Sequence, residues 1–126
     1  TAMRAALELL GSFDASGQKI VVCGDMRQLG PESSQWHRRM GDEVVTVCGA
    51  DLLIACGHYA EDVVGGARRA GMHPERTIAC RHADEAAHQL EQKLDVGDVV
   101  LVKGSRALAL ERIVERLHAA PLRRAA

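Results

Sequence analysis

Short aliphatic segments alternate with amphipathic ones along the chain, and this alternation constrains the fold more than any other feature. Four runs of β-branched and aliphatic residues have the length of buried strands. They cover residues 19–23, 52–56, 77–80 and 96–102. Strands that alternate with helices favour a parallel sheet with right-handed crossovers. The sequence therefore predicts an α/β, Rossmann-like, three-layer domain, with helices on both faces of a mostly parallel sheet.

Helical spacing of apolar residues separates the predicted strands. Met3, Leu7 and Leu10 share one face of a first helix that Gly11 closes. Asp84 is a plausible N-cap for the helix that precedes the last strand. The five helices are expected over residues 3–10, 31–48, 63–70, 84–94 and 110–117.

Composition narrows the class of protein. A chain of 126 residues fits one domain, and 47% apolar with 26% charged residues is typical of a globular protein. Aromatic residues make up only 2%, so the core must be aliphatic, which suits buried parallel strands. A net charge of −1 gives no basic surface for nucleic acid, and no apolar run approaches the ~20 residues that span a bilayer. Because the chain starts at Thr1, we expect residues 1–126 to be a single domain excised from a larger protein.

Four cysteines lie apart from one another, at positions 23, 48, 56 and 80. None belongs to a Cys-x-x-Cys pair, and small buried thiols are their expected state. His58 and His82 follow Cys56 and Cys80 at predicted strand ends, where a Cys/His metal site is conceivable. Their spacing matches no ligand signature, so no metal site is expected.

Ligands of parallel α/β sheets bind beyond the carboxyl ends of the strands. The predicted fourth strand leads through Lys103, Ser105 and Arg106 into a helix, whose N-terminus suits a carboxylate or phosphate. Alternatively, Ser105 is an N-cap and Arg106 a solvated residue of the first turn. Asp25 ends the first strand, where it can accept from ribose hydroxyls or bond backbone amides of a turn.

Two histidines are candidates for the edge of this site. His58 follows the second strand, and His37 lies on the second helix, where a partly exposed side chain is the default expectation. Neither a Gly-x-Gly-x-x-Gly loop nor a P-loop is present. The part of an ATP-dependent enzyme that cradles phosphates is therefore not in this chain, and no catalytic residue is assigned within it.

Several of these segments together resemble a known family. The sequence is similar to the C-terminal domain of the Mur ligases that add D-Ala-D-Ala to UDP-MurNAc-tripeptide. The resemblance lies in residues 1–7, 24–30, Ser33 or Ser34 with His37, and 102–106 with Glu111.

The resemblance implies a role within a three-domain, cytoplasmic bacterial ligase of peptidoglycan synthesis. In this family ATP, with Mg²⁺, phosphorylates the peptide carboxylate, and the amine of D-Ala-D-Ala attacks the acyl phosphate. By similarity, Asp25 approaches the ATP ribose, while Lys103, Ser105 and Arg106 hold the incoming dipeptide. The upstream domains would supply most contacts to ATP and Mg²⁺, so the chain alone is expected to be inactive.

Two other functions are compatible with the sequence. One is a domain of another Mur-family ligase with a different amino-acid substrate. The other is a free-standing flavodoxin-like binding module, against which the start at Thr1 counts.

Overall fold

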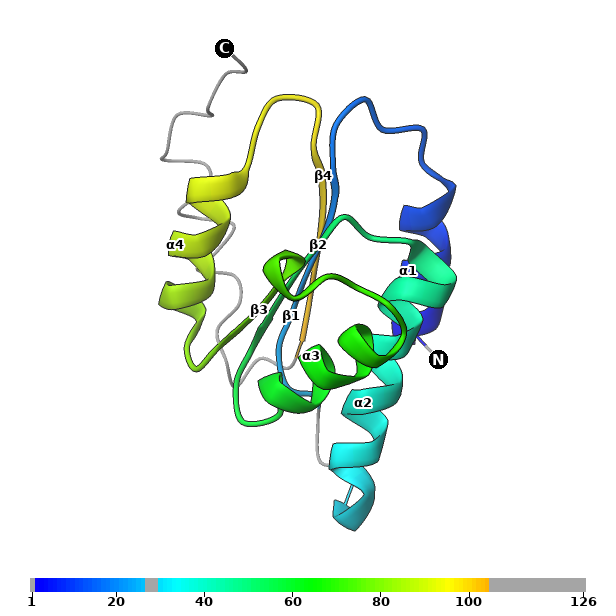
Figure 1. Ribbon diagram of the computed structural model, residues 1–126, viewed down its shortest axis with the longest axis vertical. Helices are drawn as coiled ribbons and strands as arrows, with labels where there is room; N and C mark the ends of the chain where they lie inside the picture. The colour runs from blue at the N-terminus through cyan, green and yellow to red at the C-terminus, as the bar shows by residue number, and fades with distance from the viewer. Residues whose placement is uncertain (1, 27–29, 105–126) are drawn as a thin grey trace.

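The computed structural model describes residues 2–26 and 30–104, which form a parallel four-stranded sheet between layers of helices (Figure 1). The strand order is β3-β2-β1-β4, and every neighbouring pair is parallel. The predicted α/β, three-layer fold is thereby confirmed. The strands are β1 (Lys19–Cys23), β2 (Leu52–Cys56), β3 (Thr77–Cys80) and β4 (Val99–Lys103).

Within these residues, four α-helices and three short helical turns connect or flank the strands. The α-helices are α1 (Ala2–Ser12), α2 (Ser33–Glu43), α3 (Ala60–Arg69) and α4 (Ala83–Lys93). The turns are η1 (Gly30–Glu32) and η3 (Pro74–Arg76), which are 3₁₀ turns, and η2 (Val44–Cys48), a π turn that continues α2. The helix predicted over residues 110–117 lies outside the described residues.

The two faces of the sheet are covered by different helices. Side chains alternate across β1, so Val21 packs with α1, α2 and α3, whereas Ile20 and Val22 pack with α4. The chain moves from β1 out to β3 and then returns to β4 beside β1. With right-handed crossovers this reversal of direction places α4 on the opposite face, as Figure 1 shows.

Three sequence predictions about element limits or faces were wrong. Asp84 is not an N-cap: His82 occupies that position in extended conformation, without a side-chain cap hydrogen bond. His37 was expected to be partly exposed, yet it faces the core with 1% of its surface exposed, while its neighbour Trp36 is 39% exposed. Met40 and Val44 are buried together with His37, so a polar residue completes the apolar stripe of α2 and apolar periodicity alone does not reveal it.

The third error concerns the start of β4, which begins at Val99 rather than at residue 96. Gly97 has φ +95°, which breaks the extended backbone. The Asp98 carboxylate then accepts hydrogen bonds from the backbone N–H groups of Asp95 and Gln18, both at 2.8 Å or less. Residues 95–98 are therefore a turn that is fastened to the loop before β1.

Helices α2 and α3 approach each other closely through two glycines. A Cβ on Gly41 would collide with the carbonyl oxygen of Val63, and one on Gly66 with the carbonyl oxygen of Arg38. A salt bridge of 3.2 Å between Arg38 and Asp62 closes the same contact. Backbone therefore packs directly against backbone, which fixes α3 relative to α2 and to the loops at its N-terminus.

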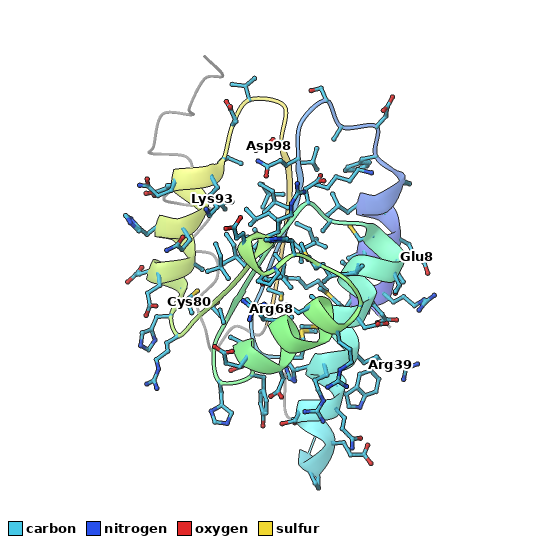
Figure 2. The ribbon with its side chains drawn as sticks, viewed as in Figure 1. Glu8, Arg39, Arg68, Cys80, Lys93 and Asp98 are labelled. Atoms are coloured by element: carbon cyan, nitrogen blue, oxygen red, sulfur yellow. The ribbon has the colours of Figure 1, made fainter. Side chains whose placement is uncertain are left out.

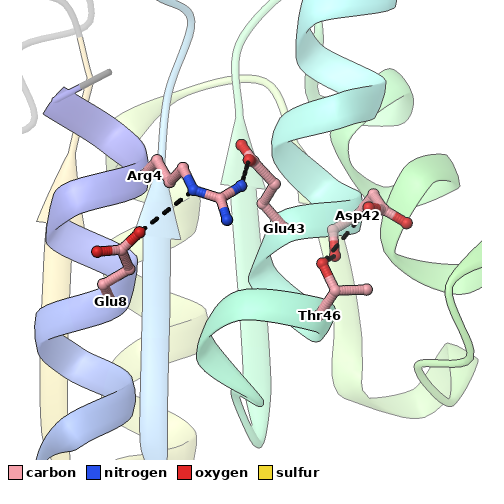
Figure 3. A network of polar contacts seen from close by, with 5 residues as sticks. All are labelled: Arg4, Glu8, Asp42, Glu43 and Thr46. Atoms are coloured by element: carbon pink, nitrogen blue, oxygen red, sulfur yellow. Dashed lines mark hydrogen bonds and ion pairs between the residues drawn. The ribbon is translucent and has the colours of Figure 1, made fainter.

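Polar contacts also join α1 to α2 (Figure 3). The Arg4 guanidinium lies 3.2 Å from a Glu8 oxygen and 2.6 Å from a Glu43 oxygen. The hydrogen bond and charge of Glu43 raise the pKa of Arg4 above its ordinary value. Because Arg4 is half exposed, solvent screens this pair, and the apolar faces of the helices contribute most of the stability of the contact.

We expect Gly66→Ala to lower the free energy of unfolding by several kcal/mol, since the added methyl must push two helices apart. Gly65→Ala is the matched control, because a Cβ at this position would have no neighbouring atom within 4 Å. Replacing this helical glycine should stabilise the protein by about 0.5–1 kcal/mol. Urea denaturation of both variants measures the difference, and equal effects would contradict the close packing.

Candidate functional site

The carboxyl ends of β1 and β4 lie side by side at the point where the strand order reverses. Cys23 and Lys103 are register partners, and the N–H of Gly24 donates to the carbonyl oxygen of Lys103 at 2.9 Å. In open parallel sheets the ligand crevice lies outside the carboxyl ends at such a reversal. The fold thus assigns the candidate site to the loops that follow β1 and β4.

Asp25, in the loop after β1, fastens the loop between β2 and α3. Its two carboxylate oxygens accept hydrogen bonds from the backbone N–H groups of His58 and Tyr59, each at 2.8 Å. Gly57 permits this approach: it has φ +114°, and a Cβ there would lie 2.6 Å from an Asp25 oxygen. The sequence allowed two roles for Asp25, and the structure confirms one of them, the hydrogen bonding of backbone amides in a turn.

The same carboxylate retains acceptor capacity. A carboxylate has about four lone-pair directions, and two backbone donors use about half of them. Contact with ribose hydroxyls therefore remains a prediction that the amide bonds do not preclude.

His37 is buried, with 1% of its surface exposed, rather than partly exposed as the sequence suggested. Its Nε2 accepts a hydrogen bond from the N–H of Met26 at 3.1 Å, so its Nδ1 carries the proton and donates to the Ser33 carbonyl oxygen at 2.6 Å. The histidine is thus neutral in this arrangement and joins the loop after β1 to α2.

Tyr59 connects these residues and was not singled out by the sequence. Its ring stacks on His37 with centroids 4.4 Å apart and meets the exposed His58 edge-on at 4.8 Å. It is the only tyrosine in an aromatic-poor chain and lies in the loop after a predicted strand. These two features could have marked it as a candidate site residue. Asp25, His37, His58 and Tyr59 therefore form one continuous cluster, with His37 beneath the surface.

Lys103 is half-buried at the end of β4, beside the end of β1. It is the described member of the set of residues that the sequence predicts to hold a carboxylate or phosphate at this edge. Ser105 and Arg106, the other predicted members, lie outside the described residues. Their roles stay predictions, as does the helix N-terminus that they were expected to open.

A groove of about 660 Å³ adjoins the cluster at the carboxyl ends of β2 and β3. Cationic and acidic side chains both line it, among them Arg81 and Glu85, together with Cys80. Within residues 2–26 and 30–104, no group of three metal-binding side chains gathers. No helix in that part of the chain is long and apolar enough to cross a membrane.

The three cysteines of the strands differ in environment. Burial raises the pKa of the Cys23 thiol to about 12. Cys56 is buried as well, whereas Cys80 is partly exposed to the groove. The expectation of small buried thiols thus holds for all but Cys80.

The fold and site define a Rossmann-like domain that presents an acidic and a cationic strand end on one edge. The family described as "Mur ligase, glutamate ligase domain" matches residues 1–106. The chain therefore belongs to the Mur ligase family and corresponds to its C-terminal domain.

Among similar proteins is the UDP-N-acetylmuramoyl-tripeptide–D-alanyl-D-alanine ligase of Bacillus subtilis, 29% identical over 97% of this chain. Solved structures of similar fold include MurF from Acinetobacter baumannii, with a TM-score of 0.79, and MurF ligase from Thermotoga maritima in complex with ADP, with a TM-score of 0.70. Each is 27% identical to this chain and is aligned over 94% of it. The chain spans about a quarter of these proteins, 26% of the first and 25% of the second and third.

We expect Asp25→Asn to lower the free energy of unfolding by about 1–3 kcal/mol. An asparagine offers one acceptor oxygen, and its amide group would face the second backbone N–H. Asp14→Asn is the matched control, because Asp14 is exposed in the loop before β1. Thermal or urea denaturation provides the measurement, and hydrogen exchange at His58 and Tyr59 should accelerate only in the Asp25 variant. Unchanged exchange would contradict the clamping role.

Proposed function

We propose that this chain is the third domain of a three-domain, ATP-dependent ligase that joins D-Ala-D-Ala to UDP-MurNAc-tripeptide in the bacterial cytoplasm. The observation that carries the proposal is the β1–β4 edge at the reversal of strand order, where Lys103 ends β4 and Asp25 lies in the loop after β1. Its support is the similarity to D-alanyl-D-alanine-adding ligases along almost the whole chain.

The reaction needs a phosphoryl acceptor, an amine and protection from water. The terminal phosphate of ATP passes to the peptide carboxylate, which gives an acyl phosphate and ADP. The amine of D-Ala-D-Ala then attacks the acyl carbon, and inorganic phosphate leaves. A domain that closes over this intermediate would exclude water from it.

Each candidate residue has a chemical task in this scheme. The free lone pairs of Asp25 would accept from the ATP ribose hydroxyls. Use of ATP is supported by a similar solved structure that is a complex with ADP. Lys103, with Ser105 and Arg106, would hold the carboxylate of the incoming dipeptide. His37 would hold the Asp25–Met26 backbone in place, and His58 would border the nucleotide.

The phosphates of ATP and the Mg²⁺ ion would be bound mainly by the preceding domains. The 126 residues contain no P-loop, and the described residues gather no three-ligand metal cluster. In this proposal the chain contributes the ribose contact, the dipeptide contact and closure of the site.

We expect Lys103→Gln, in the full-length ligase that contains this chain, to lower kcat/KM for D-Ala-D-Ala by about ten- to a hundredfold, the value of one charge-assisted hydrogen bond. Lys93→Gln is the matched control, since Lys93 ends α4 and lines a hollow at the opposite, amino-terminal edge of the strands. Phosphate release at varied dipeptide concentration measures the effect. Equal kinetics for both variants would remove Lys103 from the dipeptide site.

Substrate competition separates this function from that of another Mur-family ligase. With UDP-MurNAc-tripeptide and ATP supplied, the full-length protein should turn over with D-Ala-D-Ala and not with D-glutamate, L-alanine or diaminopimelate. The chain of 126 residues alone should form no product. Preference for a single amino acid, or ligation by the isolated chain, would overturn the proposal.

A further inference from the structure

Two cysteines end neighbouring strands at the groove beside the candidate site. Cys56 is the last residue of β2 and Cys80 the last of β3, and the two are register partners in the parallel sheet. Both side chains belong to the face of the sheet that α4 covers, and Figure 2 labels Cys80 there. The pair thus brings together two thiols that are well separated in sequence.

The spacing of the two backbones fits a disulfide bond. Adjacent strands lie about 4.8 Å apart, and a disulfide joins Cα atoms about 4.4–6.8 Å apart. The Cys80 thiol donates a hydrogen bond to the carbonyl oxygen of Ala55 at 3.5 Å, so its sulfur is directed toward β2, the strand that ends at Cys56.

Access distinguishes this pair from the other two cysteines. Cys80 lines the groove of about 660 Å³, and Cys56 lies directly behind it with 1% of its surface exposed. Cys23 is fully buried on the opposite face of the sheet, and Cys48 belongs to the same core as Cys23. A reagent that enters the groove therefore meets Cys80 first.

We propose that Cys56 and Cys80 form a reactive dithiol, which a low-molecular-weight disulfide oxidises through the groove to a disulfide bond between the ends of β2 and β3. Nothing in the ligase reaction uses either thiol, so this modification site is independent of the proposed function.

The chemistry balances as two thiol–disulfide exchanges. The Cys80 thiol loses its proton to solvent in the groove, and its thiolate attacks one sulfur of the oxidant, so a mixed disulfide forms and one thiolate leaves. The Cys56 thiol then loses its proton, and its thiolate attacks the Cys80 sulfur and releases the second thiolate. The two protons lost by the cysteines end on the two released thiolates. Two electrons pass from the cysteines to the oxidant, which is reduced to two thiols.

The cross-link would be reversible and close to Asp25. Because Cys80 lines the groove, a thiol that enters the groove can reduce the bond by the same exchange. Gly57 follows Cys56 and donates its N–H to the Cys80 carbonyl oxygen at 3.0 Å. The next two amides bond Asp25, so oxidation would act on the backbone that holds this carboxylate.

The experiment treats the native chain of 126 residues with oxidised glutathione, then counts free thiols after denaturation and maps disulfides by mass spectrometry. We expect free thiols to fall from four to two, with one bond between the peptides of Cys56 and Cys80, and dithiothreitol to restore all four. Cys23→Ala and Cys48→Ala, the matched controls, should form the same bond.

A trapping variant keeps the test informative if the disulfide is slow to form. In Cys56→Ala the exchange should stop at the mixed disulfide, with glutathione on Cys80 and on neither Cys23 nor Cys48. Four unreacted thiols in the native chain, a bond that involves Cys23 or Cys48, or glutathione spread over all cysteines of the trapping variant would each overturn the proposal. Circular dichroism verifies that each variant is folded.

Discussion

Burial of β1 and β2 on both faces is the constraint on which the rest of the structure depends. Ile20, Val21 and Val22 are completely buried, so helices must cover the sheet above and below. Each such side chain contributes about 1.5–3 kcal/mol when it leaves water. This requirement produces the three layers, and the return of the chain to β4 produces the strand reversal at which the candidate site lies.

The candidate site is held by contacts between loops rather than by the strands themselves. Asp25 bonds the backbone before α3, while His37 bonds the backbone of Met26 from α2. The direct glycine-mediated packing of α2 against α3 keeps these two anchors at a constant separation. Gly66, which lies outside the candidate site, therefore supports the geometry of the acidic strand end.

Local sequence patterns predicted the elements better than their edges or their polar contacts. Aliphatic runs identified all four strands of the described part of the chain, since side-chain burial depends on local composition. The start of β4 was misplaced because Asp98 is fastened to Gln18, a contact between residues 80 apart. His37 was expected at the surface because its partners, Met26 and Tyr59, come from other elements and leave no periodic signal.

The sequence by itself determined the α/β class and the parallel sheet, because the alternation of strands and helices leaves few topologies open. It also predicted the edge of the sheet at which the candidate site lies. It also determined which strand ends carry Asp25 and Lys103. Only the tertiary structure decided that Asp25 clamps the α3 loop, that His37 is buried and neutral, and that Cys56 faces Cys80. Those features depend on strand order and on register between distant segments, which hydrogen bonds and core packing fix together.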